Sequence, residues 1–246
     1  ATSSVRPTTE APIVTIKTAD QRDPRDVPNY SLGEAARWLG LVPNTLRVWL
    51  QGQAYPVHGG TRHAKPVVHP AATNPTSLSF WNLVECSVLL TMRKQHRVSL
   101  QKVRKALDYV GKHLGKRRPL IEQDFSTDGV GLFVDHYGKL IEASKQGQTA
   151  IREILQAGLT RIERDEEGLA ARLFPWRDDP REDRIVALDA RVAFGQPVLA
   201  NTRIPVEVVF DRFRAGDTIE ALAADYRVAG ETIEDLVRKW FGSAAA

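Results

Sequence analysis

The chain has 246 residues, 42% of them hydrophobic and 26% charged, which is typical of a globular protein with room for two or three small domains. The single cysteine, Cys86, excludes an internal disulfide framework, and the lack of a membrane-length apolar run or signal-peptide pattern predicts a cytoplasmic protein without membrane contact. Residues 1–118 hold 18 Lys and Arg against 7 Asp and Glu, whereas residues 119–246 hold 16 against 23, so the net charge of +4 is uneven. Unless both halves are simply solvated surfaces, the basic front favours a polyanion and the acidic back favours a protein partner or dimerisation.

The first predicted elements are two short helices that follow a flexible arm at residues 1–28, a stretch rich in Thr, Pro and Ser. Ser31 and Glu34 form a capping-box pattern for the first helix, which we expect to end near Gly40. Pro43 suits the first turn of the second helix, because a proline there leaves no hydrogen bond unmade. Apolar residues recur at helical spacing at Leu32, Ala35, Ala36, Leu39, Leu46, Trp49 and Leu50. Two amphipathic helices joined by a short break predict a helix-turn-helix.

The second of these helices carries candidate DNA-binding residues. Because its apolar side chains point inward, the intervening Asn44, Thr45 and Arg47 are predicted to project outward. Arginine can form two hydrogen bonds to guanine, and asparagine or threonine can contact adenine or phosphate. The alternative is that Asn44 and Thr45 only cap the helix and that Arg47 is solvated.

Residues 55–78 have the Pro- and Gly-rich composition of loops and hairpins, centred on Gly59-Gly60-Thr61-Arg62. A hairpin placed directly after a helix-turn-helix would form a wing. Arg62, His63 and Lys65 are then expected to contact phosphate or the minor groove, the alternative being an exposed polar loop. The irregular spacing of the histidines in this stretch, without companion cysteines, predicts no metal site.

Two further helices are expected, from Phe80 to His96 and, capped by Ser99, along the apolar stripe from Leu100 to Leu114. The whole order over residues 29–116 resembles the MerR family, with Ser31, Glu34, Ala35, Thr45, Leu46 and Arg47 as the matching helix-turn-helix residues. The resemblance implies a winged helix-turn-helix DNA-binding domain over residues 29–118. MerR-type metal sensing is not implied, because Cys86 lies among apolar residues as a core side chain would.

The middle segment, residues 119–184, is predicted to be a small α/β unit that ends in a charged linker at residues 175–184. We expect short strands at 132–134 and 140–141 around a turn at 136–138, and a helix at 149–157. Two more strands are expected at 159–162 and 169–174, with a turn between them at 165–168. The acidic residues and His136 of this segment lie near expected turns, where aspartate is favoured for local hydrogen bonding, so they predict no catalytic site.

The last segment, residues 185–242, is predicted to contain two strands followed by three helices. The strands are expected at 185–188 and 197–199, and the helices near 205–215, 218–226 and 231–241. Asp217 with Glu220 is expected to cap the middle helix. The last two helices form a second helix-turn-helix pattern, which could contact DNA through Thr232 and Arg238 or serve in protein docking; the acidic balance favours docking.

Residues 185–240 resemble a small domain of unknown function, numbered 433, that occurs in VapB-type antitoxins. The matching residues are Gly195, Pro197, Val198, Thr202, Arg203, Ile204, Pro205, Val206, Ala215, Gly216, Ile219, Asp225 and Tyr226. Asn201 departs from the usual glycine, and a left-handed turn remains possible because asparagine tolerates that conformation. Gly195, Pro197, Thr202 and Arg203 are candidate turn or partner-contact residues, and Arg203 could alternatively hold the turn through backbone carbonyls.

Together these features predict an α+β fold that is mainly α, with an N-terminal winged helix-turn-helix, a small middle α/β segment and a C-terminal trihelical domain with a short β-hairpin. The resemblances imply an antitoxin that binds and silences a PIN-like ribonuclease toxin and, as a homodimer, regulates its own operator DNA. A stand-alone transcriptional regulator and an adaptor that never meets DNA are the alternatives. No cofactor and no enzymatic activity are expected.

Overall fold

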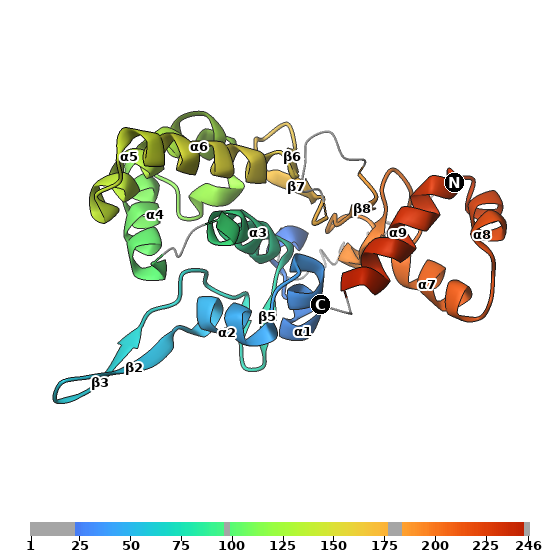
Figure 1. Ribbon diagram of the computed structural model, residues 1–246, viewed down its shortest axis with the longest axis horizontal. Coiled ribbons are helices and arrows are strands. Elements are labelled where there is room, and N and C mark those ends of the chain that lie inside the picture. Colours follow the sequence, from blue (N-terminus) through green and yellow to red (C-terminus); the bar gives the residue numbers. More distant parts are fainter. Residues whose placement is uncertain (1–22, 96–98, 177–183, 244–246) are drawn as a thin grey trace, which may run out of the picture.

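The computed structural model describes residues 23–95, 99–176 and 184–243, and its fold is mixed α and β with helices predominating, as predicted. The helices are α1 (Leu32–Leu39), α2 (Pro43–Gln51), α3 (Phe80–Gln95), α4 (Leu100–Leu114), α5 (Val130–Ile141), α6 (Lys145–Leu159), α7 (Val206–Arg214), α8 (Ile219–Tyr226) and α9 (Gly230–Ser243). The strands are β1 (Tyr30–Ser31), β2 (Gln53–Val57), β3 (Gly60–Ala64), β4 (Ala72–Thr73), β5 (Thr76–Leu78), β6 (Ile162–Arg164), β7 (Ala170–Leu173), β8 (Val186–Ala187) and β9 (Val198–Leu199). Hairpin β2–β3 and helices α7–α9 lie at opposite ends of the molecule (Figure 1).

The helix-turn-helix is built by the local signals that predicted it. Ser31 Oγ accepts a hydrogen bond from the Glu34 amide at 3.2 Å, and Glu34 Oε2 accepts one from the Ser31 amide at 2.8 Å, so the capping box of α1 is complete. The helix ends at Gly40 in a left-handed conformation, and α2 begins at Pro43. Buried apolar residues on both helices belong to the same core cluster as those of α3 and fix the pair, namely Ala35, Ala36, Leu39, Leu46, Trp49 and Leu50.

Hairpin β2–β3 begins two residues after α2 and is the predicted wing. Its antiparallel register runs from Gln53↔Ala64 to Val57↔Gly60, so the turn falls at the expected glycine pair. Gly52 makes the abrupt start possible, because its φ is +78° and an added Cβ would lie 1.9 Å from the Ala64 carbonyl oxygen. The wing therefore leaves the body of the protein at a fixed point.

Helix α3 lies at the centre of a core that the front and middle segments share. Buried residues of α3 and α4 form one continuous cluster with Phe125, Phe133, Leu155 and Leu173 from the middle segment. Asn82 on α3 binds the loop after the wing, donating to the His69 carbonyl and accepting from the Ala71 amide. The boundary expected near residue 118 thus does not divide two cores.

The strands expected at 132–134 and 140–141 are wrong, because residues 130–141 form the continuous helix α5. Val130, Phe133, Val134 and Tyr137 are buried at helical spacing and pack into the shared core. Gly138 is not a turn residue. It lets α6 approach α5 closely, since an added Cβ would lie 2.9 Å from the Gln148 side chain. Helix α6 continues to Leu159, so the strand predicted at 159–162 begins only at Ile162, as β6. The antiparallel pairing of β6 with β7 is as expected.

The predicted arm 1–28 extends too far, because its last part packs onto the protein; residues 1–22 lie outside the described residues. Pro24–Asp26 form a 3₁₀ turn, and the side chain of Arg25 is 1% exposed. Its guanidinium forms ion pairs with Asp23 at 2.6 Å and with Asp165 at 2.5 Å, and it lies over the Trp81 ring. A buried cation with two carboxylates thus attaches the N-terminal segment to the β6–β7 hairpin.

The C-terminal segment forms a second core from α7, α8, α9 and the antiparallel pair β8–β9, as predicted. The helix-capping expectation is wrong by one residue: the Thr218 hydroxyl accepts from the Ala221 amide at 3.2 Å, while Asp217 binds Arg212 Nε at 2.6 Å. The expected linker falls at 175–184, of which 177–183 lie outside the described residues. No helix in the described ranges is both long and apolar enough to cross a membrane.

Candidate DNA interface and partner-binding turn

Helix α2 presents a polar face away from the core. Leu46 and Trp49 are buried, whereas Asn44 and Arg47 are exposed and Thr45 is half-buried. Arg47 Nη1 lies 3.4 Å from Asn44 Oδ1, one turn away, so the two side chains project side by side. In addition, Val42 at the start of the helix is 67% exposed, although its apolar side chain gives no sequence signal of a surface position. The outward geometry predicted for this helix is present.

The predicted contact residues of the wing lie on β3 and directly after it. Arg62 pairs with Tyr55 across the hairpin, His63 pairs with Ala54, and Lys65 follows β3 directly. All three of Arg62, His63 and Lys65 have exposed side chains. The Lys65 carbonyl accepts a hydrogen bond from Arg104 Nη1 at 3.0 Å, so α4 supports the base of the wing. Among the described residues, no three His, Cys, Asp or Glu side chains lie together in a way that could hold a metal ion, and this includes the histidines of this region.

The second candidate region is the turn around Gly195. Ala193, Phe194 and Gly195 have φ values of 47°, 56° and 81°, so three consecutive residues adopt the left-handed conformation. Such a backbone is strained for the first two residues and needs support from its surroundings. Support comes from the front of the chain, because Asn29 Nδ2 donates to the Phe194 carbonyl at 2.7 Å and the Tyr30 hydroxyl donates to the Gly195 carbonyl at 2.6 Å.

Phe194 at this turn is 92% exposed. A phenylalanine in this position brings no packing energy to the fold, yet its backbone is held rigidly in a strained conformation. Gly195 and Pro197, which flank this residue, are predictable from the sequence, whereas Phe194 is not, since an isolated phenylalanine is typical of a core position. The pattern that could have identified it is the neighbouring glycine and proline, which predict a tight turn and hence a surface position.

The other predicted turn residues divide into structural and exposed ones. Pro197 is buried, and its carbonyl accepts from the Val206 amide at 3.0 Å at the start of α7. The Thr202 hydroxyl donates to the Leu199 carbonyl at 2.8 Å and accepts from the Ile204 amide, and Asn201 is left-handed as expected. Arg203 is exposed and has no hydrogen bond or ion pair within the described residues, so nothing in them supports the alternative that it holds the turn through backbone carbonyls.

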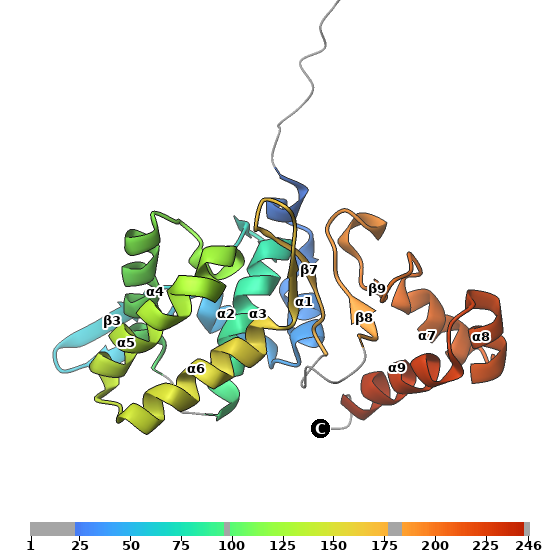
Figure 2. The ribbon, with the colours of Figure 1, turned by 90° about the horizontal axis from the view of Figure 1, so that it is seen from above.

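Aromatic rings join the helix-turn-helix to the C-terminal core. Trp38 on α1 is buried against Trp176 and Trp240, with ring centroids 5.3 and 5.1 Å away. Beside it, the Arg37 guanidinium lies 3.4 Å from the centroid of the Trp240 ring, a cation–π contact. Figure 2 shows α1 and α9 on either side of this junction. The helix-turn-helix and the C-terminal helices are therefore in direct contact.

The second helix-turn-helix has a surface that differs from that of α2. Arg238 on α9 forms ion pairs with Glu234 at 2.5 Å and Asp235 at 2.8 Å, which neutralise the charge that a phosphate contact would need. This arrangement favours the protein-docking interpretation of α8–α9 over DNA binding.

Two family models and two known proteins are similar to this chain. A family model described as "Putative DNA-binding HTH domain" matches residues 28–107, and one described as "Protein of unknown function (DUF433)" matches residues 186–238. Over 227 residues the chain is 30% identical to the "Putative antitoxin VapB45" of Mycobacterium tuberculosis (strain ATCC 25618 / H37Rv), covering 85% of this chain and 92% of that protein. The chain belongs to this antitoxin family. A crystal structure of Rv2018 from Mycobacterium tuberculosis is also similar, with 27% identity, a TM-score of 0.64 and coverage of 86% of this chain and 98% of that one.

The two matching family models overlap the two candidate regions. The helix-turn-helix model covers α2 and the wing, and the DUF433 model covers the Gly195 turn and the helices after it. The chain thus matches a helix-turn-helix model at its front and the DUF433 model at its end, and it aligns with the antitoxin relative over most of the length of both proteins. The likeness to MerR regulators stays a prediction.

Proposed function

We propose that this protein is an antitoxin that binds and silences a PIN-like ribonuclease toxin, and that represses its own operator as a homodimer. The observation that carries the DNA-binding part is the polar face of α2, with Asn44 and Arg47 exposed beside each other on a helix fixed by a complete cap and a buried core. One such helix reads few base pairs, so a two-fold dimer would be needed to double the site.

On the DNA, α2 would lie in the major groove and the wing beside it. Arg47 would contact a guanine edge, with Asn44 and Thr45 on an adenine edge or phosphate. Arg62, His63 and Lys65 would contact the phosphate backbone or the minor groove. The protein would bind its operator DNA in the cytoplasm. It would act by binding alone and would need no cofactor.

The toxin would bind at the Gly195 turn. Phe194 is an exposed aromatic residue on a rigid turn, the arrangement expected of an anchor that enters an apolar pocket of a partner. Arg203, in the same domain, has an exposed side chain without a hydrogen bond or ion pair to the residues that the structure describes, and it would add a polar contact. A ribonuclease needs a basic surface to bind RNA. Residues 119–246 are acidic, with 23 Asp and Glu against 16 Lys and Arg, so their charge is complementary to such a surface.

Co-purification of the untagged neighbouring gene product, identified by mass spectrometry, tests the antitoxin proposal. We expect a stoichiometric small ribonuclease-like protein, and restored RNA cleavage once the two are separated. Recovery of operator binding without any partner would overturn the toxin part and leave a stand-alone regulator. Absence of salt-sensitive DNA binding would overturn the repressor part.

A further inference from the structure

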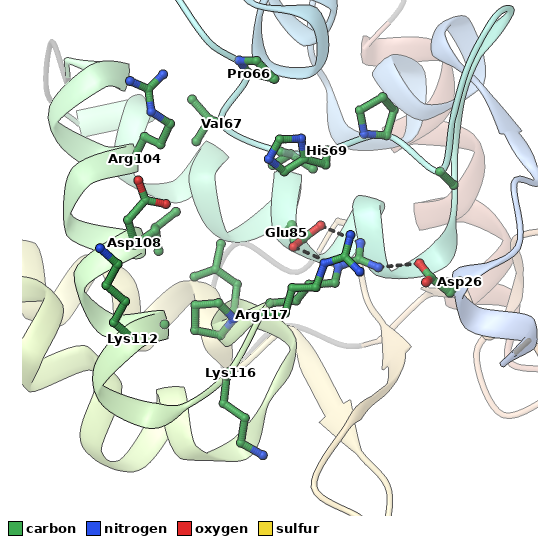
Figure 3. A pocket seen from close by; sticks show the side chains of 18 of the residues that line it. Asp26, Pro66, Val67, His69, Glu85, Arg104, Asp108, Lys112, Lys116 and Arg117 are labelled. Carbon is green, nitrogen blue, oxygen red and sulfur yellow. Dashed lines mark hydrogen bonds and ion pairs between the residues drawn. The ribbon is translucent and has the colours of Figure 1, made fainter.

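A groove of about 1000 Å³ lies between helix α4 and the segment that follows the wing. One wall is residues 66–71, the other is the face of α4 that carries Arg104, Asp108 and Lys112, and the floor is residues 115–120 (Figure 3). The groove is open on one side. Neither the recognition helix nor the tip of the wing contributes to its lining.

Two of the cations in the groove have structural partners. Arg118 donates to Glu85 through Nε at 3.2 Å and Nη2 at 2.7 Å, and its Nη1 binds Asp26. Lys116 forms ion pairs with Glu122 at 3.2 Å and Asp124 at 3.7 Å. These pairs attach the floor to α3 and to the middle segment, and they leave no charge for a ligand.

Three other cations of the groove lack a carboxylate partner among the described residues. Lys112 and Arg117 are exposed, and the only hydrogen bond of the Arg104 side chain in the described ranges goes to the Lys65 carbonyl. Arg118 pairs with both Asp26 and Glu85. Five Lys and Arg line the groove, namely Arg104, Lys112, Lys116, Arg117 and Arg118, against the three carboxylates of Asp26, Glu85 and Asp108. The groove therefore carries an excess of positive charge.

We propose that this groove holds the phosphate backbone of DNA beyond the wing, an inference that rests on the proposed DNA-binding function. The Arg104–Lys65 hydrogen bond makes the groove continuous with the base of the wing. From Arg104 to Lys112 the helix rises about 12 Å. Successive phosphates of one strand advance about 3.4 Å along the DNA axis, so this length matches several phosphates and not a single anion. The groove thus lengthens the footprint on the wing side without reading sequence.

The test is the salt dependence of DNA binding by the full chain carrying Lys112→Gln and Arg117→Gln together. Lys139→Gln, which removes an exposed cation from α5, is the matched control. The probes are a duplex from upstream of the protein's own gene and a scrambled duplex of equal length. Each lost phosphate contact lowers the slope of log K against log salt by about 0.9, so the double variant should lose about 1.8.

Because phosphate contacts carry no sequence information, both duplexes should weaken equally, by about 10-fold per contact at 0.1 M salt. Slopes and affinities identical to those of the unaltered protein and of Lys139→Gln would overturn the groove proposal while leaving the DNA-binding function intact. Melting curves confirm that each variant is folded. Absence of salt-dependent binding by the unaltered protein would instead overturn the proposed function itself.

Discussion

The hydroxyl of Tyr30 lies 2.6 Å from the carbonyl oxygen of Gly195 and donates a hydrogen bond to it. Tyr30 belongs to the strand that leads into α1, and Gly195 belongs to the turn that presents Phe194. Burial raises the pKa of Tyr30 well above its usual value, so the hydroxyl stays protonated and remains a donor. The proposed DNA-reading unit and the proposed toxin-binding turn are thus hydrogen-bonded to each other.

Gly195→Ala should damage this junction. The backbone φ of +81° is unfavourable for alanine, and the new Cβ would lie 2.6 Å from Asn29 Nδ2 and 2.8 Å from Tyr30 Oη. We expect the free energy of unfolding to fall by about 2–4 kcal/mol in urea denaturation. Gly216→Ala is the matched control, since its φ is +103° and no atom lies near the added Cβ. Equal losses in both variants would show that the close contact contributes nothing.

Arg47→Ala should weaken sequence-specific binding to operator DNA by about 1–3 kcal/mol and relax the preference at one base pair. The reason is the loss of a two-hydrogen-bond contact from the exposed face of α2. Fluorescence anisotropy with a set of singly substituted duplexes measures both effects. Arg238→Ala serves as the control, because that side chain is already paired with Glu234 and Asp235. An unchanged base preference in Arg47→Ala would exclude α2 as the recognition helix.

Phe194→Asn should separate toxin binding from folding. Asparagine tolerates the left-handed backbone better than phenylalanine, so the folding stability should stay the same or rise slightly. Toxin affinity should fall by at least about 2 kcal/mol, as for a central interface anchor. Isothermal titration calorimetry with the purified toxin and thermal melting measure the two quantities. Val208→Gln, at a 45% exposed position on α7, should leave affinity unchanged, and a normal affinity in Phe194→Asn would place the toxin elsewhere.

The Arg25 ion pairs should make stability depend on pH in the acidic range. The hydrogen bond from Arg25 lowers the pKa of Asp23. Burial tends to raise the pKa of Asp165, but hydrogen bonds from the Leu169 amide and from Arg25 outweigh burial, so this pKa is lowered too. A carboxylate with a lowered pKa stabilises the fold above its unfolded pKa of about 3.9, and this contribution is lost as pH falls through the folded pKa. The melting temperature should therefore drop steeply below about pH 4.

Arg25→Met should lower the free energy of unfolding by about 2–4 kcal/mol at pH 7, because it leaves Asp23 and Asp165 without their cation. The same substitution should flatten the acidic part of the curve of melting temperature against pH. Arg191→Met is a milder comparison, since its guanidinium lies 3.6 Å from Asp165 and is 53% exposed. A variant curve parallel to the original would mean that other groups control the acid transition.

Elements with strong local signals could be predicted from the sequence. The capping box at Ser31, the glycine at position 40 and the proline at position 43 act within one or two turns, so α1 and α2 follow from neighbouring residues alone. The left-handed Asn201 and the C-terminal helices are similar cases. The outward face of α2 follows from the same helical period, so its candidate residues could be found as well.

Features that depend on distant contacts could not be predicted in this way. Gly138 suggests a turn until the position of Gln148 on the neighbouring helix is known. The burial of Arg25 requires Asp165, which is 140 residues away. The hydrogen bonds that hold the turn of Phe194 come from Asn29 and Tyr30, which lie 165 positions away from the carbonyls they bind, and no pattern within the segment shows that support. The shared core of front and middle segments likewise depends on contacts across the chain.

The tryptophan cluster at the junction gives the molecule a spectroscopic signal of its own. Three of the five tryptophans, Trp38, Trp176 and Trp240, meet where α1 contacts the C-terminal core. Their ring centroids lie no more than 6.1 Å from one another. Separation of α9 from α1 would bring these indoles into water together and shift their emission to longer wavelength, while Trp49 would stay buried in the front core. Intrinsic fluorescence can therefore follow, without any label, whether DNA or a protein partner opens the contact between the two halves of the chain.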